Sequence, residues 1–311
     1  LDDAVPSDRI IGAQAPGGTG AFHQILLLIR SMGKGQKIWI SSPSWPNHAA
    51  ILNHLGIEFK NYFYFDKETC EVNFPRMISD LDKMSSGDVL LLHGCCHNPT
   101  GANLSIEHWI ELTKFCEKKN ILPLIDLAYQ GFGDGIDDDV KGIQYMASKL
   151  SELCIGVSCS KNFGLYRERV GASLLLVPDK KNRKLAEDNL KSLNRLTFSF
   201  PPDHGAAVIE LILVEPDLKE KWQTELEYMR KGMLDLRLKL SESLRKKTDS
   251  DRFDFISHHR GMFSRLGLSK KNVQVLREEF GVYMVSDSRI NIAGLQSRNI
   301  DFLASSISKI L

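Results

Sequence analysis

Strand-like and helix-like segments alternate from residue 10 to residue 177, and this order constrains the fold more than any other feature of the sequence. Several strand-like segments are continuous apolar runs, which is typical of strands covered on both faces of a parallel sheet. The repeated strand–helix order therefore predicts a doubly wound α/β domain. The expected strands are residues 10–15, 37–41, 61–65, 88–93, 121–126, 154–158 and 171–177. The expected helices are residues 21–32, 47–55, 74–84, 106–119 and 141–150.

The pattern changes after about Pro216, where a charged, amphipathic stretch predicts a long helix from residue 218 to about residue 246. Beyond it we expect a smaller α/β domain. Its expected elements are a helix near residues 270–280, strands at residues 282–285 and 289–292, and a last helix at residues 300–310. We therefore expect a large domain over residues 1–228 and a small C-terminal domain over residues 229–311.

Composition bounds the function class. A chain of 311 residues allows one large or two modest domains. The formal net charge is +1 without a basic block, which gives no reason to expect a nucleic-acid or membrane partner. No apolar run approaches the roughly 20 residues of a membrane span, and no secretory signal is visible. The six cysteines lack CxxC or zinc-finger spacing, so we expect free thiols in a reducing cytoplasm.

Polar and glycine-rich segments follow five of the expected strands. Ligands in doubly wound domains bind at the carboxyl ends of the strands, so these segments are the candidate site. They are residues 17–20, 45–48, 98–101, 126–129 and 158–161.

Lys161 is the strongest single candidate for chemistry. An apolar strand runs directly into the turn 158–161, which is rich in small hydroxyl residues. A lysine at such a strand mouth can be desolvated, which lowers its pKa and allows the amine to form a Schiff base. A lone lysine after a strand is more often a surface residue, so the remaining segments must decide.

The turn at residues 16–20 is a candidate phosphate site. Its glycines let the backbone approach a phosphate closely, and the following helix N-terminus offers free N–H groups. Alone the signal is weak, because the turn lacks both the GxGxxG pattern and the lysine of a P-loop.

Asp126 ends the most apolar of the expected strands. A carboxylate there needs a cationic partner, and a protonated pyridine nitrogen would be one. A helix N-cap for the residues that follow is an equally good explanation.

Other side chains near these strand ends can complete such a site. Tyr129 and Asn98 can donate hydrogen bonds to a ring oxygen, although Asn98-Pro99 is locally more typical of a plain turn. Trp45 can stack on a ring or belong to the core. His48 can orient Asp126 or be structural.

Three arginines have the side chain that anion recognition favours. The guanidinium binds carboxylate or phosphate with two parallel hydrogen bonds, which lysine cannot do. Each is more often a solvated surface charge. They are Arg169, Arg195 and Arg289.

Together these segments supply a partner for every part of pyridoxal 5'-phosphate, and their order and spacing resemble those of a known family. From about residue 10 to the C-terminus the sequence is similar to the aspartate/aromatic aminotransferases, subgroup Iα of the fold type I pyridoxal-phosphate enzymes. The matching segments are residues 17–20, 44–48, 97–101, 126–132, 160–171 and 288–294. The resemblance implies a large, cofactor-binding domain with a mostly parallel seven-stranded sheet and helices on both faces, followed by a smaller α/β C-terminal domain.

The resemblance also implies roles for the residues around the cofactor ring. Lys161 would form the Schiff base and move the proton between the substrate Cα and the cofactor. Asp126 would bind the pyridine nitrogen, with His48 behind it. Tyr129 and Asn98 would hydrogen-bond the ring oxygen.

Further roles follow for the phosphate and the substrate. Trp45 would stack over the ring, and it and Asn98 would also face the substrate. Arg289 would bind the α-carboxylate. Arg195 would reach the neighbouring subunit's site and bind the side-chain carboxylate, which makes a homodimer part of the mechanism. The residues expected to hold the phosphate are Gly18, Thr19, Ser158 and Arg169.

The sequence also departs from the family pattern. The chain begins at Leu1 rather than Met, and family members are expected to carry about 90 more residues at the N-terminus, far more than the uncertainty of element ends. A tyrosine that reaches the other subunit's phosphate would lie there. Arg265 occupies a position near the substrate entrance at which an uncharged residue is expected.

The sequence therefore predicts a cytoplasmic, homodimeric aminotransferase. It would move the amino group of L-aspartate, and also of aromatic amino acids, to 2-oxoglutarate by a ping-pong mechanism. One alternative is a β-decarboxylase or lyase on the same scaffold. The other is a non-catalytic, truncated fragment.

Overall fold

The chain forms a seven-stranded, mostly parallel sheet in the order β1-β7-β6-β5-β4-β2-β3. The computed structural model describes residues 5–33 and 35–311. Only β7 runs antiparallel to its neighbours, β1 and β6. The strands are β1 (Ile10–Pro16), β2 (Ile38–Ser42), β3 (Phe59–Phe63), β4 (Val89–His93), β5 (Leu122–Leu127), β6 (Leu153–Ser158) and β7 (Val170–Leu176).

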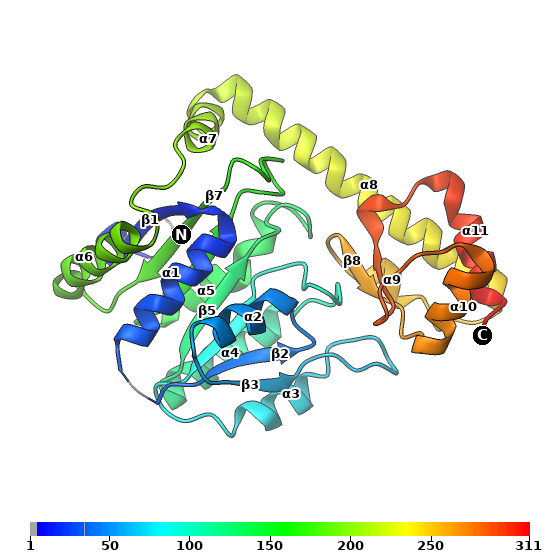
Figure 1. Ribbon diagram of the computed structural model, residues 1–311, viewed down its shortest axis with the longest axis horizontal. Coiled ribbons are helices and arrows are strands. Elements are labelled where there is room, and N and C mark those ends of the chain that lie inside the picture. Colours follow the sequence, from blue (N-terminus) through cyan, green and yellow to red (C-terminus); the bar gives the residue numbers. More distant parts are fainter. Residues whose placement is uncertain (1–4, 34) are drawn as a thin grey trace.

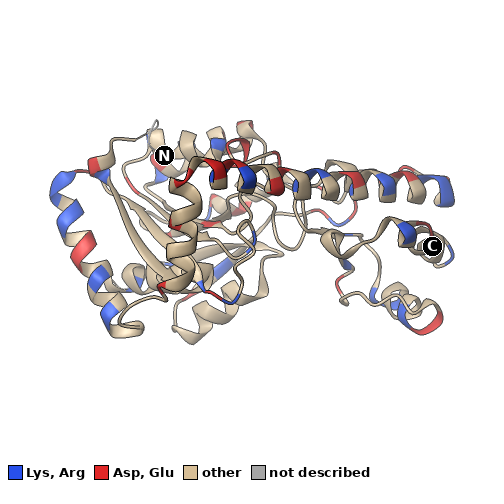
Figure 2. Ribbon diagram, turned by 90° about the horizontal axis from the view of Figure 1, so that it is seen from above, with Lys and Arg blue, Asp and Glu red and all other residues tan. Residues whose placement is uncertain are grey.

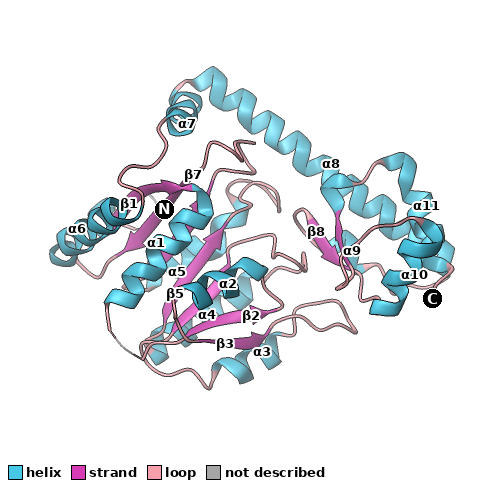
Figure 3. Ribbon diagram, viewed as in Figure 1, coloured by secondary structure: helices cyan, strands magenta, loops and turns pink. Residues whose placement is uncertain are grey.

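Helices cover both faces of this sheet (Figures 1 and 3). Residues of α1, α2 and α6 pack in one apolar cluster and residues of α3, α4 and α5 in another, and alternate residues of β4 contribute to each. This two-sided burial explains why the central strands are continuous apolar runs. The helices are α1 (Gly17–Ser31), α2 (Pro46–His54), α3 (Phe74–Leu81), α4 (Ile106–Lys119), α5 (Lys141–Lys149) and α6 (Lys180–Thr197).

A long helix, α8 (Pro216–Thr248), runs from α7 (His204–Val214) to the C-terminal elements (Figure 1). Charged residues of both signs are spread along it, as is typical of a largely solvated helix (Figure 2). The predicted boundary at residue 228 falls inside α8 and stays a prediction. The C-terminal elements are α9 (Phe255–His258), β8 (Phe263–Arg265), α10 (Lys270–Phe280), β9 (Arg289–Asn291) and α11 (Ser297–Ser308), with β8 and β9 paired antiparallel.

All seven strands expected in the large sheet are present, with ends shifted by at most two residues. The expected strand at residues 282–285 is wrong, because this described segment has no regular secondary structure and pairs with no strand. Helices α6 and α7 were not expected. Helix α7 is apolar nearly all round, so it presents no clear amphipathic period. Helix α6 does have an apolar stripe of Ala186, Leu190 and Leu193, although only Leu190 is fully buried. In the part of the chain that the structure describes, no helix has the length and apolarity to cross a membrane.

Candidate active site

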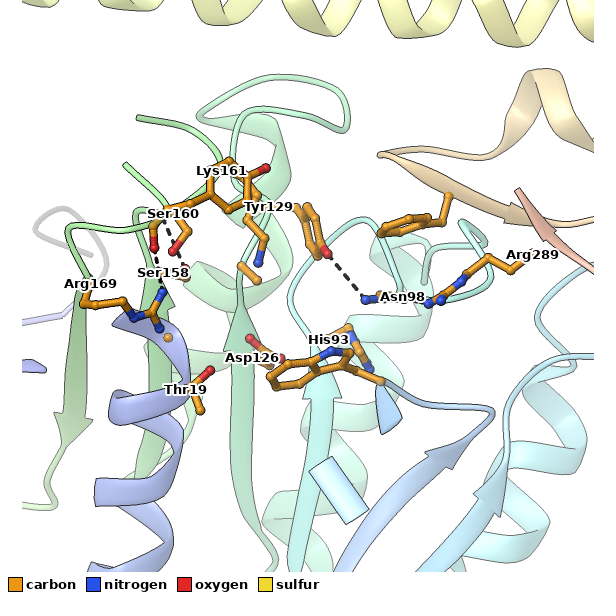
Figure 4. A pocket seen from close by; sticks show the side chains of 15 residues that line it. Thr19, His93, Asn98, Asp126, Tyr129, Ser158, Ser160, Lys161, Arg169 and Arg289 are labelled. Atoms are coloured by element: carbon orange, nitrogen blue, oxygen red, sulfur yellow. Dashed lines mark hydrogen bonds between the residues drawn. The ribbon is translucent and has the colours of Figure 1, made fainter. Parts of the chain in front are cut away.

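A cavity of about 350 Å³ lies at the carboxyl ends of β4, β5 and β6, bordered by β8 and β9 (Figure 4). It brings together ten of the predicted site residues from segments far apart in the sequence. They are Gly18, Thr19, Trp45, Asn98, Asp126, Tyr129, Ser158, Lys161, Arg169 and Arg289.

The carboxylate of Asp126 lines the cavity and is hydrogen-bonded by the buried side chain of His48. Asp126 is the penultimate residue of β5, so it is not the N-cap of a helix. His48, fully buried on α2, contacts it with Nε2 2.8 Å from Oδ2. The hydroxyl of Ser44 lies 3.0 Å from Nδ1 of His48 and 3.2 Å from Nε2 of His93. Burial alone would raise the pKa of Asp126, but the hydrogen bond and charge of His48 lower it overall. Asp126 therefore presents a carboxylate to the cavity.

Lys161 stands in the turn after β6, with its Nζ 4.7 Å from the centre of the Tyr129 ring. Burial lowers the pKa of Lys161; Arg169 lowers it further, and Asp126 opposes the shift. A lowered pKa increases the share of neutral amine, which is the nucleophilic form.

One end of the cavity is built to bind an anion. The N-terminus of α1 directs N–H groups and the positive end of the helix dipole toward it. A Cβ on Gly17 would lie 2.3 Å from Nη2 of Arg169, and one on Gly18 would lie 2.7 Å from Cβ of Ser158. Only glycine therefore lets the backbone, the serine hydroxyl and the guanidinium converge. Arg169 itself donates to the carbonyls of Pro16 (3.3 Å) and Tyr166 (2.9 Å).

The opposite end joins the sheet to the C-terminal elements. Asn98 Nδ2 donates to the hydroxyl of Tyr129 at 3.4 Å, and Arg289 Nη1 donates to Oδ1 of Asn98 at 3.3 Å (Figure 4). The Arg289 guanidinium also lies 5.1 Å from the centre of the Phe263 ring. Burial raises the pKa of Tyr129, and Asp126 adds to this, so the phenol stays protonated and can donate.

Two predicted residues lie outside the cavity lining. His48 lies behind Asp126, as expected. Arg195 is exposed on α6 and donates from Nη1 to Oγ of Ser199 at 2.5 Å; its role in a neighbouring subunit stays a prediction. Arg265 lies opposite Arg289 and binds Asp287, with Nε 3.1 Å from the carbonyl oxygen and 3.5 Å from Oδ2; its effect on the substrate entrance stays a prediction.

Sequence reasoning missed three prominent lining residues, His93, Tyr166 and Phe263. His93 ends the apolar strand β4 as Asp126 nearly ends β5, so the same pattern could have identified it. Phe263 belongs to β8, and it lines the cavity with Arg289 of β9 because these two strands pair. That pairing has no local signal.

Comparison with known proteins agrees with this geometry. The family model described as aminotransferase class I and II matches residues 2–307. The chain is 49% identical over 310 residues to the aromatic-amino-acid aminotransferase of Paracoccus denitrificans, covering 100% of this chain and 79% of that protein. It is 41% identical over 299 residues to the aspartate aminotransferase of Escherichia coli (strain K12), covering 96% of this chain and 76% of that protein. The crystal structure of an aromatic-amino-acid aminotransferase from Burkholderia pseudomallei, covalently bound to pyridoxal phosphate, superposes with a TM-score of 0.97 at 38% identity, covering 100% and 79%.

Proposed function

Because this chain belongs to the aminotransferase class I and II family and is a pyridoxal-phosphate-dependent aminotransferase, we propose that its donors are L-aspartate and aromatic amino acids. The acceptor is a 2-oxo acid such as 2-oxoglutarate. Relatives named for both donor classes support this proposal. The observation that carries it is the convergence of Lys161, Asp126 and Arg289 on one cavity.

The residues present fit the cofactor. When bound, pyridoxal phosphate supplies an aldehyde that an amine can attack and a ring that withdraws electrons. Gly18, Thr19, Ser158 and Arg169 hold the phosphate, since they form the anion-binding end of the cavity. Trp45, which lines the cavity and lies edge-on to His48 with ring centres 5.1 Å apart, would stack on the cofactor ring.

The side chains at the cavity centre handle protons. Asp126, kept ionised by His48, holds a proton on the pyridine nitrogen. Lys161, with its share of neutral amine raised by burial, would hold the cofactor, and its Nζ would move the proton from the substrate Cα to the cofactor. Tyr129 and Asn98 donate to the ring oxygen.

Two arginines select the substrate. Arg289 binds the α-carboxylate with Asn98 beside it. Arg195 binds a second carboxylate in the site of a neighbouring subunit. Exposed apolar side chains on α6, the segment after it and α7 support a homodimer, since such surfaces are typical of an interface. They are Leu196 and Phe200 near Arg195, and Leu211 and Val214 on α7, which are between 55% and 80% exposed.

Two broader expectations accompany this function. We place the cofactor-binding domain at residues 1–228 and the small domain at residues 229–311. A cytoplasmic location is supported by the six free cysteines, five of them buried.

Borohydride reduction of the cofactor-loaded protein, followed by peptide mapping, tests the assignment of Lys161. The label should appear on Lys161 and be lost in Lys161→Ala; a label on another lysine would disprove it. Product analysis with aspartate tests the reaction, because transfer yields oxaloacetate whereas the alternative β-decarboxylation yields alanine.

A further inference from the structure

Arg237 of α8 is fully buried, and all four of its hydrogen bonds go to neutral oxygens. Its Nη1 donates to the carbonyl of Ile256 (3.2 Å) and the hydroxyl of Ser264 (2.7 Å). Its Nη2 donates to the carbonyls of Gly261 (2.7 Å) and Phe263 (2.8 Å). Burying a cation without a counter-charge is costly, and these four oxygens are what its Nη groups bind instead. Removing Arg237 would take a donor from each of them, so the residue fixes the backbone around it.

Two of these carbonyls belong to residues pressed against the loop that carries Asn98. A Cβ on Gly261 would lie 2.4 Å from Cβ of Cys96, and a Cβ on Gly101 would lie 2.3 Å from the carbonyl oxygen of Phe263. The backbone N–H of Arg260 also donates to the carbonyl of Gly101 at 2.9 Å. Arg237 thus fixes the surface on which residues 96–101 rest.

The same backbone positions the other wall of the cavity. Phe263 begins β8, which pairs with β9 so that Arg265 lies opposite Arg289. The ring of Phe263 contacts the guanidinium of Arg289, which in turn donates to Asn98. Arg237 therefore lies behind both side chains that face the substrate carboxylate, although it does not line the cavity itself.

A buried relay extends this support. Ser264 accepts from Arg237 and can donate its own proton to Nδ1 of His259, 3.0 Å away. Nε2 of His259 then donates to the carbonyl of Cys70 at 2.9 Å. Burial, together with the charge of Arg237, lowers the pKa of His259 to about 3, so the ring is neutral and has one donor and one acceptor. The relay links α8 to the segment that follows β3.

We propose that Arg237 is a positioning residue for the substrate carboxylate site, holding the backbone of residues 261–263 so that Arg289 and Asn98 keep their spacing. The inference rests on the proposed role of Arg289. It gives a buried residue of the long helix a part in substrate binding, not in cofactor binding.

The test compares Arg237→Met and Arg237→Lys with Arg245→Met, a matched control on the same helix. Arg245 is exposed and pairs with Asp254 at 3.2 Å. Misplacement of a positioning group by about 1 Å can cost 10²-fold. We expect Arg237→Met to raise KM for the amino acid and the oxo acid alike by about tenfold to 10²-fold. The kcat and the absorbance titration of the cofactor should change little, and Arg245→Met should match the wild type.

Binding of 3-phenylpropionate, a carboxylate without an amino group, separates this inference from the proposed function. If Arg289→Ala leaves that affinity unchanged, the role of Arg289 fails. If Arg289→Ala weakens it while Arg237→Met does not, the inference about Arg237 fails. A fall in kcat or in cofactor affinity alone would also overturn it. If Arg237→Met does not fold, Arg237→Lys provides the test, because a single ammonium group cannot bind the carbonyls of Ile256, Gly261 and Phe263 together. An unchanged affinity of Arg237→Lys for 3-phenylpropionate would then contradict the inference.

Discussion

Replacing Gly17 by alanine should weaken cofactor binding without unfolding the sheet. Gly17 has a φ of +71°, and its missing Cβ leaves room for the guanidinium of Arg169, whose Nη2 would lie 2.3 Å from that atom. Two costs follow. The left-handed backbone costs a non-glycine residue roughly 1–2 kcal/mol. In addition, the guanidinium must move away from its contact with Pro16 and from the phosphate.

The second cost sets the size of the effect on binding. A hydrogen bond to a charged group contributes about 1.5–3 kcal/mol, and about 1.4 kcal/mol corresponds to a factor of ten. Loss of one Arg169–phosphate hydrogen bond should therefore weaken pyridoxal phosphate by about tenfold to 10²-fold. Gly56→Ala is the matched control, because Gly56 has a φ of +65° and open space around its Cβ position.

Absorbance titration with pyridoxal phosphate gives the two dissociation constants, and thermal unfolding without cofactor gives the two stabilities. Both variants should lose similar stability, since both carry the backbone strain. Only Gly17→Ala should lose cofactor affinity. If the two variants bound the cofactor equally well, the clash with Arg169 would have no part in phosphate binding.

Four further outcomes are expected. Because burial lowers the pKa of Lys161, the rate at which it reacts with pyridoxal phosphate should increase with pH, with a midpoint below the ordinary lysine value of 10.5. Asp126→Asn removes a negative charge that raises this pKa, so it should lower the midpoint further; stopped-flow absorbance over a pH series measures both midpoints. Asp126→Asn should also slow exchange of the substrate α-proton by orders of magnitude while substrate affinity changes far less; unchanged exchange by NMR would refute its role. Arg195→Ala should lower kcat/KM for aspartate by at least ~10²-fold and for phenylalanine little, because only aspartate has a second carboxylate; equal losses in steady-state kinetics would make Arg195 structural. Val214→Glu should weaken a homodimer, and sedimentation showing an unchanged dimer would place the interface elsewhere.

The sequence predicted the strands and the residues that follow them, because both depend on burial. A strand covered on both faces is apolar, and the chain becomes polar where the strand leaves the core; Asp126 and Lys161 lie at two such strand ends. The resemblance then connected residues that no periodicity could bring together. Arg289 is an example, since it reaches Asn98 across 191 positions of the chain.

What could not be predicted depends on non-local packing. Arg237 looks like one more charge on an amphipathic, charged helix, and only the folded chain shows it surrounded by four oxygens. The segment 282–285 has the apolar composition of a strand but pairs with no strand, so composition alone misassigned it. Helix α7 was missed because its apolar residues surround the helix instead of forming a stripe.

The reversed direction of β7 has a consequence for how the site is assembled. Because β6 and β7 are antiparallel, with Ser158 opposite Gly171, the single connection between them carries both Lys161 and Arg169. A parallel β7 of the same seven residues would place its start about 23 Å away, at the other edge of the sheet. The covalent lysine and the phosphate-binding arginine therefore come from one hairpin, whose pairing needs little loop closure. This half of the site can form early in folding, whereas the carboxylate half must wait until α8 brings β8 and β9 to the sheet.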